Sequence, residues 1–175
     1  MKMIGKRGQS MQMPFQMIFS LFLIAVFIVV AFFVMRHFIS IQECSQVGLF
    51  YRDLQDKITS IWNAQEAEQT FEGTLPSSLK YACFLNFSRG KVLAGLNSEQ
   101  RETADNIYEE LAVYYKYKTA NFFLYPSKNT CDMPSRLLEH LDTGTASNPY
   151  CIKNEGKVKI RLYKGFNDVS VKVRQ

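Results

Sequence analysis

The longest apolar run of the sequence lies near the N-terminus, over residues 15–34, and only Gln16 and Ser20 interrupt it. An α-helix rises about 1.5 Å per residue, so residues 15–35 in helical form extend about 31 Å. That length matches the hydrocarbon layer of a bilayer, which is about 30 Å thick. The pattern predicts a transmembrane helix over 15–35 that follows a short tail, residues 1–14.

Apolar residues recur at spacings of three and four after this span, in a segment (residues 36–71) that contains no proline and one glycine, Gly48. The stripe consists of Cys44, Val47, Tyr51, Leu54, Ile58 and Ile61, with Trp62 beside the last. Arg52, Gln55 and Asp56 lie off the stripe, which predicts that they face solvent. We expect an amphipathic stem helix over 36–71 that packs on the chain's own head domain, because a free coiled-coil stalk would need a longer heptad series. Gly48 permits either a continuous helix or a bend.

Residues 72–175 are predicted to form this head domain. The expected elements are a strand over 79–87, a helix from Asn97 to about residue 118, an aromatic strand over 121–125 and a brief helix over 135–141. In the strand, Tyr81, Cys83, Leu85 and Phe87 fall on one side. In the first helix, Asn97 and Gln100 suit the N-terminus, and the apolar face consists of Ala104, Ile107, Leu111 and Tyr114.

The clearest strand signal lies at the C-terminus. Val158, Ile160 and Leu162 alternate with polar residues, and Val169, Val171 and Val173 do the same after a loop. This alternation predicts a β-hairpin with one buried face and one wet face. The predicted fold class is α+β: a single N-terminal transmembrane helix continues into an amphipathic stem helix, which packs on a small antiparallel β-sheet head.

The solvent-exposed face of this hairpin is basic, and two interpretations of this basic face stay open. Its cations are Lys157, Lys159, Arg161, Lys172 and Arg174. The favoured interpretation is a solvated sheet face, because antiparallel sheets usually leave one face in water and charged strands prevent edge pairing. The other is an interaction face for an acidic polymer, for anionic lipid head groups or for a neighbouring subunit.

The distribution of charge predicts the topology. Lys2, Lys6 and Arg7 precede the span, whereas all 16 acidic residues follow it. The positive-inside rule then keeps the N-terminus in the cytoplasm and places the C-terminal domain outside the cell membrane, which the chain crosses once. Basic and acidic residues after the span nearly balance, so the domain lacks the concentrated basic footprint of a nucleic-acid-binding protein. Membrane lipid is therefore an expected partner, and nucleic acid is not.

All four cysteines, Cys44, Cys83, Cys131 and Cys151, follow the span. An even number in an extracytoplasmic domain predicts two disulfide bonds. Their wide spacings do not suit a zinc site, in which cysteines come in close pairs. Of the possible connectivities we favour Cys131 with Cys151 and Cys44 with Cys83, although spacing alone does not decide between them.

The sequence contains no glycine-rich phosphate loop, nucleophile elbow, paired-histidine motif or acidic calcium loop. Its two histidines, His37 and His140, are far apart in the sequence and have no ligand or nucleophile pattern beside them. We therefore expect that the protein is not an enzyme and that it has no cofactor and no metal site. Asn86 begins the pattern Asn-Phe-Ser, an acceptor pattern for N-glycosylation that chance explains equally well.

The residues before the span, Lys6-Arg7-Gly8-Gln9-Ser10, resemble the processing site of archaeal type IV pilins, a class III signal peptide. The resemblance implies cleavage between Gly8 and Gln9. It also implies a long N-terminal helix whose apolar half lies in the membrane or in a filament core and whose amphipathic half packs on a β-rich head. Met13 stands where many pilins have a glutamate that contacts the neighbouring subunit during assembly.

Two functions are compatible with these patterns. The favoured one is a membrane-anchored structural subunit, pilin-like, of a cell-surface filament or of its assembly, with other membrane or filament subunits as partners. The alternative is a permanently anchored envelope binding or adhesion protein with a disulfide-stapled head. A mature N-terminus at Gln9 would indicate the first function, and an intact Met1 would indicate the second.

Overall fold

The computed structural model describes residues 12–116 and 119–174. The chain divides into two units, Met1–Gln42 and Glu43–Gln175. The second unit contains two four-stranded sheets and a second long helix, so the predicted α+β fold class is confirmed.

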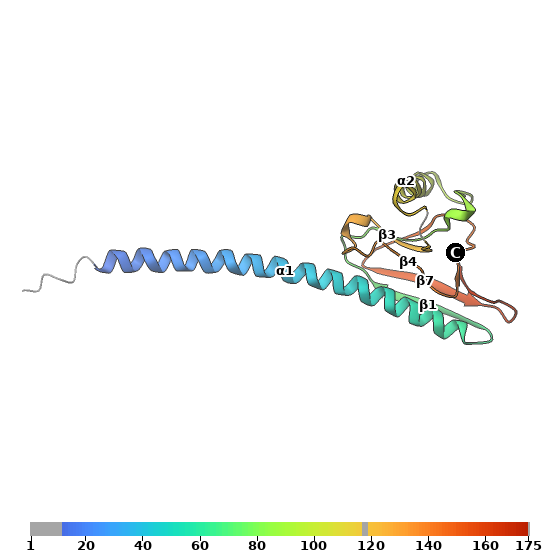
Figure 1. Ribbon diagram of the computed structural model, residues 1–175, viewed down its shortest axis with the longest axis horizontal. Coiled ribbons are helices and arrows are strands. Elements are labelled where there is room, and N and C mark those ends of the chain that lie inside the picture. Colours follow the sequence, from blue (N-terminus) through green and yellow to red (C-terminus); the bar gives the residue numbers. More distant parts are fainter. Residues whose placement is uncertain (1–11, 117–118, 175) are drawn as a thin grey trace, which may run out of the picture. The chain divides into compact units, whose positions relative to one another are not determined.

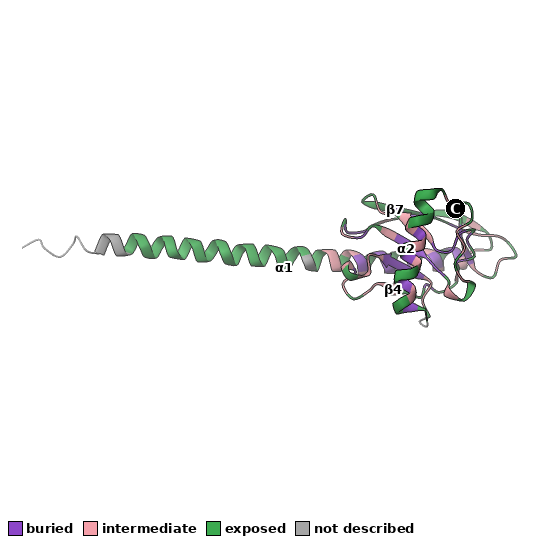
Figure 2. Ribbon diagram, turned by 90° about the horizontal axis from the view of Figure 1, so that it is seen from above, coloured by how far each residue is buried: buried purple, intermediate pink, exposed green. Residues whose placement is uncertain are grey.

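Helix α1 is the longest element and spans 51 residues, Gln12–Trp62. It includes the predicted span and most of the predicted stem, and it runs through Gly48 as one helix (Figure 1). Every side chain that the structure describes over residues 16–39 is exposed, so no side of this segment is buried by the chain itself (Figure 2). Among the described residues, α1 is the one helix long and apolar enough to cross a membrane.

The stem helix was predicted to reach residue 71, and this is wrong. The helix ends at Trp62, and strand β1 (Ala67–Thr74) follows. All eight residues of β1 pair with strand β7 (Lys157–Lys164), from Ala67 opposite Lys164 to Thr74 opposite Lys157. The partner strand lies far along the sequence, and its backbone hydrogen bonds override the local helical pattern. Residue 73, within β1, is a glycine because any other residue would place a Cβ 2.5 Å from the Phe50 ring.

The strands form two sheets. The first has the order β1-β7-β8-β5 and adds β8 (Val171–Arg174) and β5 (Leu141–Asp142) to the two strands above. The second has the order β4-β3-β2-β6, with β4 (Ser135–Arg136), β3 (Phe122–Tyr125), β2 (Tyr81–Phe84) and β6 (Tyr150–Lys153). All pairs are antiparallel except β5 with β8. The predicted C-terminal hairpin is confirmed as β7 and β8, but the prediction was wrong for Val169, which precedes β8 and is 88% exposed.

The main core lies between the second part of α1 and both sheets. The predicted stripe is confirmed, since the side chains of Val47, Tyr51, Leu54, Ile58 and Ile61 are buried there. Phe50, which lies off that stripe, is also buried and packs on Phe71 and Phe122. Trp62 is only partly buried.

Two of the three residues predicted to face solvent do so, and the third does not. Arg52 and Asp56 are exposed. Gln55 is half-buried and bonds to the backbone of Glu139: its Nε2 donates to the carbonyl oxygen, and its Oε1 accepts from the amide at 2.9 Å. A loop from elsewhere in the head therefore covers the polar side of the helix at this point.

Helix α2 (Ser98–Tyr115) covers the second sheet on the face opposite to this core. Asn97 and Gln100 form the expected capping box. The buried residues are Ala104, Ile107, Leu111 and Tyr115, so the prediction was wrong for Tyr114, which is 66% exposed. Cys83 of β2 and Leu85 just after the strand fall on one side, as predicted, and pack in the cluster that contains α2. Ala82 and Phe84 belong to the main core, so β2 is buried on both faces.

The brief helix predicted over 135–141 is absent. Strands β4 and β5 occupy its two ends, and between them His140 has a φ of 62°. A residue in the left-handed region interrupts a right-handed helix, and the pairing of Leu141 with Val171 draws the segment into the first sheet. Two short 3₁₀ turns, η1 (Phe87–Arg89) and η2 (Ser127–Asn129), complete the head.

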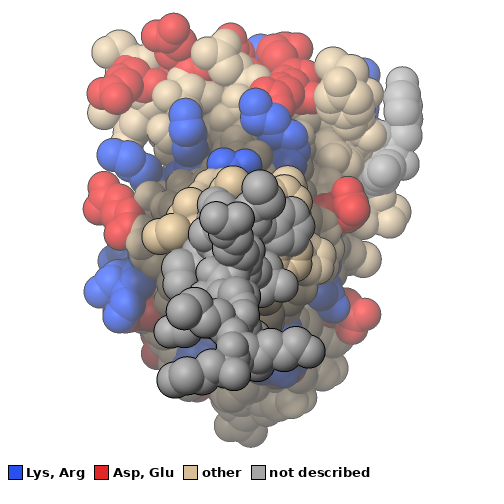
Figure 3. All heavy atoms as spheres, turned by 90° about the vertical axis from the view of Figure 1, so that its left-hand side faces the viewer, with Lys and Arg blue, Asp and Glu red and all other residues tan. Residues whose placement is uncertain are grey.

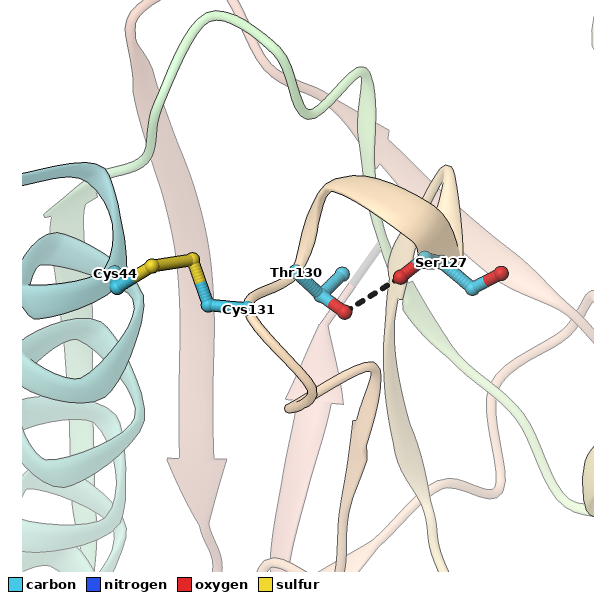
Figure 4. The surroundings of a disulfide bond; sticks show 4 residues. All are labelled: Cys44, Ser127, Thr130 and Cys131. Carbon is cyan, nitrogen blue, oxygen red and sulfur yellow. Dashed lines mark hydrogen bonds between the residues drawn. A yellow bond between two sulfur atoms is a disulfide. The ribbon is translucent and has the colours of Figure 1, made fainter. Parts of the chain in front are cut away.

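The cysteines form two disulfide bonds, as predicted, and none is free. The favoured connectivity was wrong, because the bonds join Cys44 to Cys131 and Cys83 to Cys151. Cys83 and Cys151 stand directly opposite each other on β2 and β6, with Cα atoms 4.0 Å apart. Cys131 follows η2, where the Thr130 hydroxyl donates to the Ser127 carbonyl, and it reaches the helix at Cys44 (Figure 4). An apolar N-terminal helix together with two disulfides suggests a membrane anchor and an oxidising, extracytoplasmic environment.

Candidate interaction surface

The outer face of the first sheet carries the predicted basic residues. On β7, Lys157, Lys159 and Arg161 are exposed and alternate with buried valine, isoleucine and leucine. Arg174 stands opposite Arg161, and Lys172 stands opposite Tyr163. Residues directly opposite share a face, so the structure brings all five predicted cations onto one surface. We call this surface the basic face.

Carboxylates neutralise three of these cations. Lys159 Nζ lies 2.9 Å from Glu72, and Arg174 donates to Glu68 at 2.7 Å. The hydrogen bond from Lys159 holds the pKa of Glu72 below its ordinary value. Lys172 Nζ donates a hydrogen bond to Asp168 Oδ1 at 2.6 Å and forms an ion pair with it. Within residues 12–116 and 119–174, no carboxylate forms an ion pair with Lys157 or Arg161.

A groove of about 410 Å³ lies on the basic face, lined by Thr70, Glu72, Tyr150, Lys159, Arg161 and Arg174. Five of these residues come from the first sheet, and Tyr150 comes from β6 of the second sheet. Tyr150 is half-buried and its ring stacks on Phe84, with centroids 6.3 Å apart. Burial raises the pKa of Tyr150, against the opposite effect of the nearby Arg161. Its hydroxyl can donate a hydrogen bond. Sequence reasoning missed this residue, because no local pattern marks it.

A second groove, of about 310 Å³, adjoins the first turns of α2. Its lining includes Tyr81, Asn97, Gln100, Lys153 and again Tyr150. The two grooves therefore meet at one aromatic side chain. We call them the cationic groove and the tyrosine groove.

Asn86, the possible glycosylation residue, is exposed at the start of η1. Its Oδ1 accepts a hydrogen bond from the Ser88 amide at 2.9 Å. The buried Asn148 side chain holds the Asn86 backbone: its Oδ1 accepts from the Asn86 amide, and its Nδ2 donates to the Asn86 carbonyl. The acceptor pattern thus sits on an accessible turn whose backbone is fixed.

The remaining sequence candidates do not join these grooves. His37 lies on the apolar part of α1, and His140 lies on the head surface against Trp62. Gly8 and Gln9, the possible processing site, lie outside the described residues. In the described part of the chain, no group of three or more His, Cys, Asp or Glu side chains is placed to hold a metal ion.

Positive and negative side chains are mixed on the face of the molecule seen in Figure 3. Neither sign covers that face alone, so that face presents no broad field of one sign to a charged partner. No family model, no curated protein and no solved structure matches the chain, so the inferences about its function rest on its own residues.

Proposed function

We propose that the chain is a membrane-anchored, extracytoplasmic structural subunit, pilin-like, of a cell-surface filament or of its assembly. The observation that carries this proposal is the division of α1: side chains over residues 16–39 are exposed on every side, whereas the helix from residue 43 onward packs on a β-rich head. A helix that is apolar all round needs lipid or other apolar helices around it.

The hydrophobic effect supplies the driving force for this burial. Phe19, Phe22, Phe27 and Phe33 are each more than half exposed in the isolated chain. Removing one such side chain from water contributes about 1.5–3 kcal/mol. Lipid supplies an apolar environment around the helix of a single chain, and a bundle of equivalent helices supplies it in a filament. Transfer between the two environments therefore needs no change in the head.

Topology and processing complete the proposal. The basic residues before the span favour a cytoplasmic N-terminus, and the disulfides favour an outside head. The chain then crosses the membrane once. Cleavage between Gly8 and Gln9 would release the subunit from its leader, as the resemblance to pilins implies.

Thiol cross-linking within the membrane tests the proposal. All native cysteines are in disulfides, so a cysteine introduced into the span is the only free thiol there. Phe22 and Ile24 point to nearly opposite sides of the helix, because each residue turns it by about 100°. In a bundle, the double variant F22C/I24C should form a ladder of cross-linked chains with a thiol-reactive cross-linker, whereas each single variant should stop at dimers.

The matched control for this experiment is the single variant Ser60→Cys, since Ser60 is exposed on the part of α1 that belongs to the head. It should stay monomeric, whereas the single variants F22C and I24C should each form dimers. Mass analysis of the N-terminal peptide from the same membranes should find Gln9 as the first residue. An intact Met1 together with F22C/I24C chains that stay monomeric would contradict the proposal.

The alternative function, a permanently anchored envelope binding or adhesion protein, has one observation in its favour. The head carries two grooves lined by Tyr150, and the lining of one of them is mainly cationic, which packing in a filament does not require. An intact Met1, monomeric chains and a soluble ligand for these grooves would together favour this alternative.

A further inference from the structure

Tyr150 lines both the cationic groove and the tyrosine groove, so the two grooves adjoin at this residue of β6. Each groove alone has room for a small group, whereas the pair can hold successive units of a chain. Their linings combine aromatic rings, hydroxyls, amides and cations with two carboxylates, Glu72, which is paired with Lys159, and Glu99. Such a lining suits a ligand that is polar and repetitive rather than apolar.

Arg161 supplies the charge that selects the ligand. It lines the cationic groove and stands opposite another cation, Arg174, in the sheet. Arg174 is held by Glu68 and Lys159 by Glu72, whereas no carboxylate of the described residues pairs with Arg161. An exposed guanidinium whose neighbours are already paired is free to bind a carboxylate from outside, in a bidentate manner.

The aromatic rings supply the second requirement. Tyr150 stands where the grooves meet, and Tyr81 lies in the tyrosine groove with Asn97 and Gln100 near it. Tyrosine presents an apolar ring with a polar hydroxyl, and it contacts ligands at a low cost in conformational entropy. A sugar ring has an apolar face edged by hydroxyl groups, so it matches both the rings and the amides. A bare polyanion would use only the cations.

We propose that these two adjoining grooves bind a linear acidic polysaccharide, with a carboxylate of one sugar on Arg161 and a neighbouring sugar across Tyr150 toward Lys153. Charge complementarity selects this occupant over a neutral glycan, and the aromatic lining selects it over an acidic polypeptide. The inference does not depend on whether the chain assembles into a filament.

The experiment uses the full chain in detergent micelles and measures binding of oligogalacturonate by calorimetry. Two matched probes separate the contributions: methyl-esterified oligogalacturonate keeps the sugars without the charge, and polyglutamate keeps the carboxylates without the sugars. Saturable binding of oligogalacturonate, at least tenfold tighter than that of either probe, is expected.

Variants localise the site. Arg161→Gln should weaken oligogalacturonate binding about tenfold or more, the loss expected for a charged hydrogen bond. Arg161→Lys should restore part of it. Lys153→Gln should weaken binding of a long oligomer but not that of a disaccharide. Lys128→Gln, which removes an exposed cation outside both grooves, should change nothing.

Each of three results would overturn the proposal. The first is equal weakening by Arg161→Gln and Lys128→Gln, which would indicate a diffuse charge effect. The second is polyglutamate binding as tight as that of oligogalacturonate, which would indicate an acidic protein partner. The third is the absence of saturable binding to oligogalacturonate while the variants unfold at the same temperature as the unmodified chain.

Discussion

The ring of His140 lies flat on the ring of Trp62, with centroids 3.7 Å apart and planes only 8° from parallel. Trp62 is the last residue of α1, and its Nε1 donates to the carbonyl of Val169 at 3.1 Å. The carbonyl of His140 accepts from the Val171 amide at 2.8 Å. The stacked pair thus joins the end of the helix to the strands of the first sheet.

Removal of this stack should be visible in the fluorescence of Trp62, which is the only tryptophan of the chain. We expect His140→Asn to change the intensity and to cost about 0.5–1.5 kcal/mol of unfolding free energy. Asparagine is chosen because it tolerates the positive φ of residue 140, so the ring alone is removed. Glu139→Gln, at the exposed neighbouring residue, serves as the control, and an equal effect of both variants would refute the assignment.

The end of α1 is capped by a lysine from β7. Lys164 Nζ donates to the carbonyls of Trp62 and Ala64 at 2.6 and 2.8 Å. Lys164→Met should therefore lower the unfolding free energy by about 1.5–3 kcal/mol, since two charged hydrogen bonds to backbone carbonyls at the end of the helix are lost. Lys157→Met, at an exposed residue of the same strand with which no described carboxylate forms an ion pair, should be nearly silent in thermal unfolding.

The packing of α1 on the head depends on Leu54, which is fully buried. Leu54→Ala should cost about 2–5 kcal/mol through lost contacts and the cavity that remains. Asp56→Ala, two residues away and exposed, should shift the unfolding midpoint little. If the two variants were equally stable, the helix would not be part of the core.

The disulfide connectivity is open to direct measurement. Peptide mapping without reduction should find the Cys44 peptide joined to the Cys131 peptide, and the Cys83 peptide joined to the Cys151 peptide. Replacement of Cys44 and Cys131 together by serine should cost about 2–5 kcal/mol. A peptide containing Cys131 joined to Cys151 would contradict the structure.

The ion pair of Asp168 and Lys172 predicts a pH dependence of stability. Hydrogen bonds from Lys172 and from the Gly165 amide lower the pKa of Asp168, and the bond to Asp168 raises the pKa of Lys172. Because the carboxyl pKa is lower in the folded state, its contribution is complete above the ordinary carboxyl pKa and disappears as pH falls through the folded-state value. The contribution of Lys172 disappears at the other extreme, as pH rises through its folded-state pKa.

Asp168→Asn isolates this contribution. The difference in unfolding free energy between the unmodified chain and the variant should be constant near neutral pH and should shrink below about pH 4. Denaturant unfolding at a series of pH values measures it. A difference that grows in acid would have the wrong sign for this pair.

Features with a local cause could be predicted from the sequence. The stripe from Val47 to Ile61 has the helical period, and the alternation around Ile160 has the strand period, so each pattern identifies its own buried face. The capping box of Asn97 and Gln100 is likewise complete within four residues. In each case the residues that decide the structure are neighbours in the sequence.

Features that depend on distant partners could not be predicted. The helix ends at Trp62 because β1 pairs with β7, and nothing near residue 62 encodes that pairing. Cys83 meets Cys151 through the register of β2 and β6. The residues of the two grooves around Tyr150 come from six separate segments, β1, β2, α2, β6, β7 and β8 with the residues just before α2 and β6, and they carry no shared local pattern.

The disulfide of Cys44 and Cys131 has a mechanical consequence. Cys44 is the second residue of the unit Glu43–Gln175, so a pull on the apolar segment of α1 reaches it before any of the buried residues that follow. The disulfide transmits the force from Cys44 to Cys131, in the loop after η2. The force therefore does not break the noncovalent contacts from Val47 to Ile61 one helical turn at a time. A chain loaded from its N-terminal end therefore has a covalent bond between the load and the core of its head.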